Sequence, residues 1–177
     1  LQRRHPAVPM LGICCDHSQL EDLPSHPLLL GQRRLGFFPG SSLGNFSRSE
    51  AITLLARFRQ LLAGGPLLLG LDHPKPAPVL EAAYDDAAGV SAAFARNLLH
   101  RLNRELRTDF QAERFQYRAR WQQARQRVEM ALVSKEEQSV QIGNQRWNFS
   151  TDKPLITEYS LKYSPAMARE LVEAAGW

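Results

Sequence analysis

Apolar residues in the first third of the chain form short runs that end at a turn or at an acidic residue. Residues 8–15, 35–38 and 67–71 are such runs, and each predicts a buried strand. Between the last two runs, apolar residues recur at helical spacing after Ser47, which with Glu50 has the spacing of a capping box. The order strand, strand, helix, strand predicts a mostly parallel α/β sheet covered on both faces.

The pattern changes after a proline-rich connector at residues 73–78. A long helical stretch is expected over residues 79–106, and Gly89 is a point at which it could divide in two. Residues 115–149 then alternate between apolar and polar positions and predict an antiparallel meander. In the helical stretch, apolar residues four apart predict one apolar face: Val90, Phe94, Leu98, Leu102 and Leu106.

These patterns predict two kinds of architecture in one chain. We expect part of an α/β domain over residues 1–74 and a smaller α+β lobe, a helix with antiparallel strands, over residues 75–158. Residues 159–177 are expected to return to the first domain, with an extended run up to Tyr163 and a helix that starts at Pro165.

The loop after the second apolar run is the first candidate site. Pro39 ends the strand, and Gly40 and Gly44 would let a ligand approach the backbone closely before Asn45. In an open α/β sheet, ligands bind at the carboxyl ends of the strands, where this loop would lie. An ordinary strand-to-helix turn has the same local pattern, so the loop alone leaves both interpretations open.

Composition disfavours a nucleic-acid-binding, a membrane-spanning and a disulfide-bonded protein. The 177 residues carry a formal net charge of +4, and the pI is about 9.4. The arginines are spread through helical stretches, whereas a nucleic-acid binder would concentrate them on one face. No apolar run approaches the roughly 20 residues of a membrane span. Cys14 and Cys15 are adjacent, which disfavours a disulfide and fits reduced thiols in a cytoplasmic protein.

Motifs of several enzyme classes are missing from the sequence. It contains no Gly-x-Ser-x-Gly, no Walker loop and no paired metal-binding histidines, so we expect no bound metal. The candidates that remain are polar residues at the ends of expected elements, and each could equally be an ordinary turn, core or surface residue: Asp16, Asn45, Tyr84, Glu158 and Ser160.

Several segments together resemble a known family. Phe-Phe-Pro-Gly-Ser-Ser-Leu-Gly-Asn-Phe, Ala-Tyr-Asp-Asp-Ala-Ala-Gly-Val-Ser-Ala-Ala-Phe, Asn-Arg-Glu-Leu, Val-Glu-Met and Thr-Glu-Tyr-Ser are similar to segments of the histidine Nα-methyltransferases of ergothioneine biosynthesis. The resemblance implies an enzyme that uses S-adenosylmethionine to trimethylate the α-amino group of L-histidine, which gives hercynine. It also implies that residues 1–74 are part of a Rossmann-like methyltransferase domain and residues 75–158 a substrate-binding lobe.

The resemblance further implies which residues bind the cofactor. Asp16 and His17 match the pair that contacts adenine, although the family usually has an apolar residue at the position of His17. Gly40 matches the residue that lines the gap between the methyl donor and the amine.

It implies a substrate pocket as well. Asn45 and Tyr84 match residues that hold the carboxylate end of the amino acid, and Glu158 and Ser160 match residues that hold the imidazole. Met130 matches a residue that shapes the imidazole pocket. Catalysis is then expected to be mostly positioning, with no nucleophile and no metal.

The family's glycine-rich cofactor loop and an upstream pocket tyrosine have no counterpart in this sequence. We therefore expect the chain to be the later part of a longer, monomeric enzyme and to be inactive alone. Alternatives are a non-catalytic amino-acid-binding module, a methyltransferase for another amino acid and, from the pI alone, a nucleic-acid binder. Our expectation is a small-molecule substrate, with neither nucleic acid nor membrane as a partner.

Overall fold

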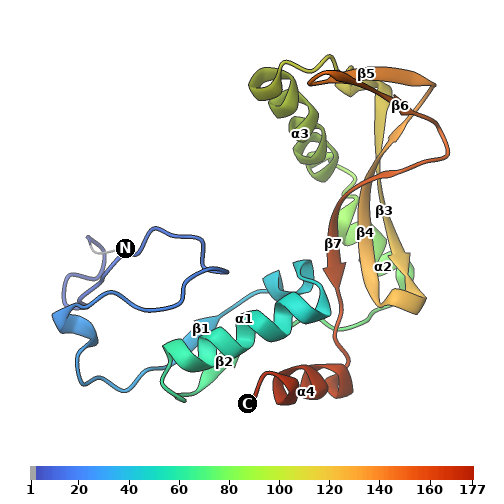
Figure 1. Cartoon of the computed structure of the whole chain (residues 1–177). Coiled ribbons are helices and arrows are strands. Elements are labelled where there is room, and N and C mark those ends of the chain that lie inside the picture. Colours follow the sequence, from blue (N-terminus) through green and yellow to red (C-terminus); the bar gives the residue numbers. More distant parts are fainter. Residues whose placement is uncertain (1–2) are drawn as a thin grey trace. The chain divides into compact units, whose positions relative to one another are not determined.

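The computed structural model describes residues 3–177, which divide into two compact units (Figure 1). The first unit takes in the described part of Leu1–Gly40 together with Ser47–Gly70 and Pro165–Trp177. The second unit consists of Ser41–Phe46 and Leu71–Ser164. No helix within residues 3–177 is both long enough and apolar enough to cross a membrane.

The first unit contains a parallel strand pair with a helix in the connection. Strand β1 (Gly36–Phe38) pairs in parallel with β2 (Leu67–Leu69), and α1 (Arg48–Leu61) lies between them in sequence. Helix α4 (Pro165–Ala174) packs on α1. The expected β–α–β arrangement and the expected helix after Pro165 are therefore confirmed.

Helix α1 begins where the sequence predicts. The Ser47 hydroxyl accepts a hydrogen bond from the Glu50 amide at 3.3 Å, and the Glu50 carboxylate accepts one from the Ser47 amide at 2.8 Å. These two bonds form the predicted capping box. The helix ends at Leu61, and in the turn that follows Gly64 has a φ of +75°, which suits a glycine, and its amide bonds to the Arg59 carbonyl at 3.0 Å.

The prediction of a buried strand at residues 8–15 is wrong. Over the described chain these residues form no strand, and apolar side chains such as Met10 and Ile13 are exposed. A strand needs a neighbour for its backbone groups, and within residues 3–177 β1 and β2 pair only with each other. Phe37 and Leu68 are more than half exposed, so the expected cover on both faces of this sheet is also absent from the described residues.

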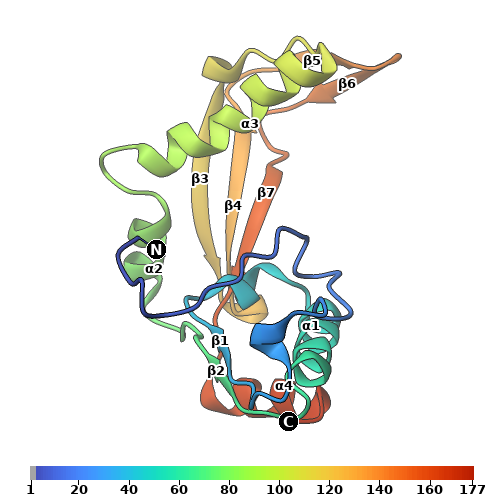
Figure 2. The ribbon, with the colours of Figure 1, turned by 90° about the vertical axis from the view of Figure 1, so that its left-hand side faces the viewer.

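The second unit is built on antiparallel strands. Strands β3 (Phe115–Gln122), β4 (Arg127–Ser134) and β7 (Leu155–Leu161) lie side by side in the order β3-β4-β7, as Figure 2 shows. Strands β5 (Gln138–Ile142) and β6 (Gln145–Phe149) form a separate hairpin. The predicted antiparallel pairing is confirmed, but the strands of residues 115–149 do not form one meander, because β4 pairs with β3 and β7 and not with β5. Short 3-10 helices complete the chain: η1 (Pro27–Leu29), η2 (Ser42–Asn45), η3 (Ala112–Arg114) and η4 (Gln123–Arg125).

The expected long helix is divided in two, as Gly89 suggested. Helix α2 (Ala77–Tyr84) ends before the break and α3 (Val90–Leu106) begins after it, and Gly89 between them has a φ of +72°. The Asp86 carboxylate accepts hydrogen bonds from the amides of Val90 at 3.0 Å and Ser91 at 2.7 Å. Bonds from the Ser91 side chain and backbone, and then from Val90, lower the pKa of Asp86 to about 2.

The predicted apolar face of α3 is wrong. Residues four apart advance about 40° around a helix, so five such residues sweep roughly 160° and do not share one face. Val90 and Phe94 are more than two-thirds exposed, whereas Leu99 is completely buried. The face that packs on the sheet carries Ala92, Ala95, Leu99 and Leu102, which follow the 3.6-residue repeat.

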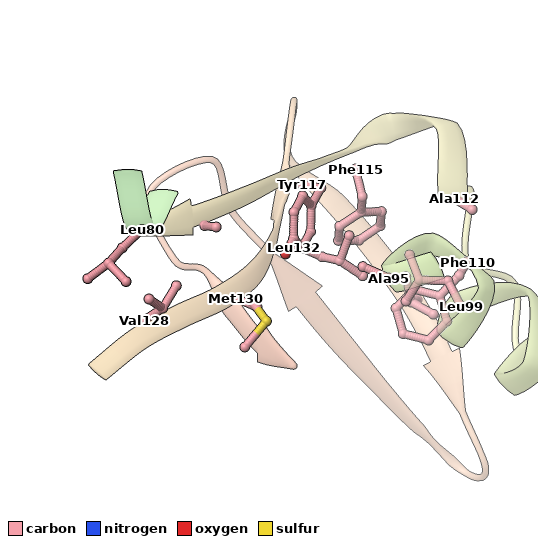
Figure 3. Close-up of a cluster of buried hydrophobic side chains, with 12 residues drawn as sticks. Leu80, Ala95, Leu99, Phe110, Ala112, Phe115, Tyr117, Val128, Met130 and Leu132 are labelled. Carbon is pink, nitrogen blue, oxygen red and sulfur yellow. The ribbon is translucent and has the colours of Figure 1, made fainter. Parts of the chain in front are cut away.

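The core of the second unit lies between α2, α3 and one face of the sheet (Figure 3). Phe115, Tyr117 and Ala119 alternate inward from β3 as predicted, and Val128, Met130 and Leu132 do so from β4. Leu80 of α2 and Leu99 of α3 cover them.

The division of the chain differs from the expected boundaries at two places. A boundary after Glu158 falls inside β7, whose register on β4 runs from Leu155 to Leu161, so the second unit extends to Ser164. The first boundary was expected after Pro74, whereas the second unit begins at Leu71 and includes the loop Ser41–Phe46. That loop contacts β7.

Candidate functional site

A cavity of about 620 Å³ opens in the second unit, between α3 and the sheet face that carries the core. Three of the predicted site residues line it: Tyr84 from the end of α2, Met130 from β4 and Glu158 from β7. Its other wall carries Val90, Phe94, Leu98 and Arg101 from α3. The exposed apolar residues Val90, Phe94 and Leu98 of α3 therefore face a cavity that combines apolar and polar lining residues.

An irregularity in β7 places Glu158 beside Met130. Met130 is paired with Glu158 and Ala131 with Ile156, so Thr157 is an extra residue in the β7 strand. The Thr157 hydroxyl donates to the Met130 carbonyl at 3.1 Å, which takes up a backbone acceptor at this point. The bulge thus sets the position of the carboxylate in the cavity.

Asn45 contacts this carboxylate directly. Its Nδ2 donates to Oε1 of Glu158 at 2.7 Å. The loop that carries Asn45 lies against β7 because Gly44 has no side chain. A Cβ there would lie 2.6 Å from the Leu161 carbonyl oxygen and 3.0 Å from its amide nitrogen.

A second polar cluster lies behind Tyr84. The hydroxyls of Tyr84 and Ser160 share a hydrogen bond at 2.8 Å. The Lys162 ammonium donates to Tyr84 at 2.6 Å and to Ser160 at 2.9 Å, and it lies 3.2 Å from an oxygen of Asp72. Lys162 is completely buried, although it is charged.

Asp72 links this cluster to the loop of Asn45. Its amide donates to the Ser41 hydroxyl at 3.1 Å, and its carboxylate also pairs with Lys75. Partial burial acts to raise the pKa of Asp72, but the hydrogen bonds from Lys75 and Lys162 outweigh it and hold the pKa below its ordinary value. Asp72 is therefore the anionic partner of two lysines.

Tyr117 also lines the cavity, and its hydroxyl donates to the Tyr84 carbonyl at 2.8 Å. Burial, followed by the nearby carboxylates of Asp85, Glu158 and Asp86, raises the pKa of Tyr117 to about 12. Tyr117 stays a protonated donor at neutral pH and fixes the backbone at Tyr84.

The residues predicted to bind the cofactor belong to the first unit. Oδ1 of Asp16 accepts bonds from the amide and hydroxyl of Ser18, and Oδ2 accepts one from Gln19. These bonds, with the Ser18 hydroxyl first, lower the pKa of Asp16. The His17 ring lies 6.0 Å from that of Phe38. Gly40 has a φ of +74° and open space where a Cβ would stand.

The profile of one protein family, described as "Histidine-specific methyltransferase, SAM-dependent", matches residues 1–177. This chain belongs to that histidine-specific methyltransferase family. The resemblance found in the motifs is therefore confirmed at the level of the family.

Individual relatives agree with the family profile. The chain is 37% identical to a histidine N-alpha-methyltransferase of Mycobacterium tuberculosis, over 99% of this chain and 54% of the relative. It is 38% identical to a histidine N-alpha-methyltransferase of Mycolicibacterium smegmatis, over 96% and 53%. Ergothioneine biosynthesis protein 1 of Schizosaccharomyces pombe is 27% identical over 94% of the chain and 22% of the relative. The chain thus spans about half the length of the mycobacterial relatives.

In this member of the methyltransferase family, the structure brings the expected substrate residues together in one unit. Tyr84, Met130 and Glu158 line the cavity, whereas Asn45 and Ser160 do not line it and hydrogen-bond to Glu158 and Tyr84, respectively.

Sequence reasoning missed Lys162, although the sequence carried a signal for it. Glu158, Ser160 and Lys162 are two residues apart along one strand, and strand alternation places such residues on the same face. A lysine in that series, next to two candidate site residues, could have been identified as part of the cluster.

Proposed function

We propose that the protein carrying this sequence is an S-adenosylmethionine-dependent methyltransferase that converts L-histidine to trimethylhistidine (hercynine) in ergothioneine biosynthesis. One observation supports this most: Tyr84, Met130 and Glu158, from three separate elements, line one cavity in a chain of the histidine-specific family. The names of the mycobacterial relatives agree with this substrate and reaction.

In this proposal the two units have different tasks. The first unit is part of a Rossmann-like methyltransferase domain, since its parallel β1–α1–β2 arrangement is the repeating element of that fold. The second unit is the substrate-binding lobe. The protein acts as a cytoplasmic monomer on a small molecule, with neither nucleic acid nor membrane as a partner. The free thiols of Cys14 and Cys15 are compatible with that compartment.

The cofactor residues of the first unit fit S-adenosylmethionine chemically. The Asp16 carboxylate is exposed, and Oδ2 has one hydrogen-bond partner within the protein, so it can accept another from a ribose hydroxyl or an adenine amine. His17 is proposed to contact the adenine with Asp16. Gly40 presents backbone without a side chain, which suits close approach of a ligand. Bound S-adenosylmethionine would supply an electrophilic methyl group.

The substrate residues are proposed to recognise the two ends of histidine. Glu158 uses one carboxylate oxygen for Asn45, which leaves the other to accept a charge-assisted bond from the imidazole N–H. Met130 forms the wall beside it, and Ser160 is the second imidazole partner. Asn45 and Tyr84 hold the carboxylate end. The reaction then needs the amine held in line with the methyl group, so positioning supplies most of the catalysis.

The test is methylation by the purified full-length protein that carries this sequence. With S-adenosylmethionine and L-histidine, mass spectrometry is expected to show successive addition of methyl groups to the α-amine, ending at trimethylhistidine. Histamine, which lacks the carboxylate, and tryptophan, which lacks the imidazole, are expected to be poor substrates. Methylation of another amino acid in preference to histidine would contradict the proposal.

A further inference from the structure

Lys162 is a buried charge that needs an explanation. Its side chain is completely inaccessible to solvent, and burial of an ammonium is costly unless every donor is satisfied. The three N–H donors of an ammonium meet three acceptors here: Tyr84 Oη at 2.6 Å, Ser160 Oγ at 2.9 Å and Asp72 Oδ2 at 3.2 Å. The lysine is therefore held in one place by a complete set of partners.

These bonds determine how many protons the Tyr84 and Ser160 hydroxyls can still donate to other groups. Both accept from Lys162, and one bond joins them, so one of their two protons is left over. Tyr84 lines the cavity. When Ser160 donates to Tyr84, the phenol oxygen accepts from both neighbours, and its own proton is then available for an acceptor in the cavity.

Resting on the proposed function, we propose that Lys162 is a positioning residue for the carboxylate of the amino-acid substrate. It orients the Tyr84 hydroxyl as a donor toward the cavity and places a positive charge directly behind that donor. A donor backed by a cation in a protein interior binds a carboxylate more strongly than a neutral hydroxyl does. The ammonium also lies 4.6 Å from the centre of the Tyr84 ring, which holds the ring itself.

A purely structural role for Lys162 predicts a different outcome. Lys162 could serve only to neutralise Asp72 and so stabilise the unit. When Lys162 is replaced by an uncharged residue, Asp72 keeps Lys75 and the His73 amide as partners. Lys162→Met has a similar length and removes the charge, so the fold is expected to survive. Lys75→Met is the matched control, because Lys75 also pairs with Asp72 and has no bond to either hydroxyl in the described structure.

The experiment measures binding and methylation of L-histidine, and binding of histamine, by the full-length protein. In Lys162→Met, histidine affinity is expected to fall about ten- to a hundredfold, the size of one charge-assisted hydrogen bond, and KM is expected to rise more than kcat falls. Histamine affinity is expected to change less than threefold. In a Tyr84→Phe background, Lys162→Met is expected to add little, and Lys75→Met is expected to behave as wild type.

Other outcomes overturn the inference and are distinguishable from failure of the proposed function. If the wild type binds histidine and Lys162→Met binds it equally well, the positioning role is contradicted but the proposed function is not. The same holds if Lys162→Met loses histidine and histamine binding to the same extent. A wild type that neither binds nor methylates histidine contradicts the proposed function and the inference with it. If Lys162→Met does not fold, Lys162→Gln keeps N–H donors without the charge, and an unchanged histidine affinity in that variant contradicts the inference.

Discussion

Asn45 donates a hydrogen bond of 2.7 Å to Glu158, although the two residues are 113 positions apart in the sequence. The bond ties the loop after β1 to the bulged strand β7 within the second unit. In the proposed enzyme these residues serve opposite ends of the substrate. Their direct contact means that the two ends are not recognised independently.

Coupling between Asn45 and Glu158 is therefore the first prediction. The losses of histidine affinity in Asn45→Ala and Glu158→Ala should not add up in the double variant. A coupling free energy of about 0.5–3 kcal/mol is typical of residues in direct contact. Isothermal titration of the four proteins in the cycle measures this coupling. Additive losses would show that the bond plays no part in binding.

Gly44 is predicted to tolerate no side chain. In Gly44→Ala the new Cβ would overlap the Leu161 carbonyl, so the loop has to move away from β7 and carry Asn45 with it. Overpacking of this kind costs about 1–3 kcal/mol of stability, and histidine affinity should fall as well. Thermal melting and histidine titration check both effects.

Gly12→Ala is the matched control, because its Cβ would meet no atom within 4 Å. It should leave both the melting temperature and histidine affinity unchanged. Equal behaviour of the two alanine variants would contradict the close packing of the loop on β7.

Alanine substitutions on the two sides of α3 are predicted to lower the stability of the protein by different amounts. Leu99 is completely buried in the core, so Leu99→Ala should lower the free energy of unfolding by about 2–5 kcal/mol. Phe94 is 77% exposed and faces the cavity, so Phe94→Ala should lower it by less than about 1 kcal/mol. Urea unfolding of both variants decides which face of the helix is buried. The reverse order would restore the face that the four-residue spacing predicts.

Asp86, which caps the start of α3, is predicted to stabilise the fold by an amount that depends on pH. Its pKa falls from 3.8 to about 2 on folding, so the stabilisation is complete above about pH 3.8 and disappears as the pH falls through about 2. Asp86→Ala should therefore be less stable than wild type at pH 7, and the difference should shrink across that window. Denaturant midpoints at a series of pH values measure it.

Asp85→Asn is the control for this effect, since among residues 3–177 the Asp85 side chain makes no hydrogen bond to the first amides of α3. It should shift the midpoint little at pH 7. A difference between Asp86→Ala and wild type that is constant from pH 7 to pH 2 would contradict the capping role.

Local chemistry explains which parts of the fold could be predicted. The capping box at Ser47, the alternation along β3 and the break at Gly89 depend on neighbouring residues, and each is confirmed. The strand at residues 8–15 depends on a pairing partner, which the sequence does not specify, and that prediction is wrong.

The candidate site also has features that the sequence predicts and features that it does not. The family motifs indicated Tyr84, Met130 and Glu158, and the structure places them around one cavity. The Asn45–Glu158 bond and the burial of Lys162 arise from long-range packing through the bulge at Thr157 and the close approach of Gly44. The Asn45–Glu158 bond has no signal in local spacing. The alternation of Glu158, Ser160 and Lys162 places the lysine on the face of the site residues, but that it is completely buried is known only from the structure.

The central claim is that Glu158 recognises the imidazole of histidine. The most direct test compares methylation of histidine and tryptophan by the full-length wild type and by Glu158→Ala. Loss of one charge-assisted bond, about 1.5–3 kcal/mol, should lower kcat/KM for histidine by one to two orders of magnitude and reduce the preference for histidine over tryptophan. An unchanged preference in Glu158→Ala would contradict the account and leave Glu158 as a strand residue that only holds Asn45.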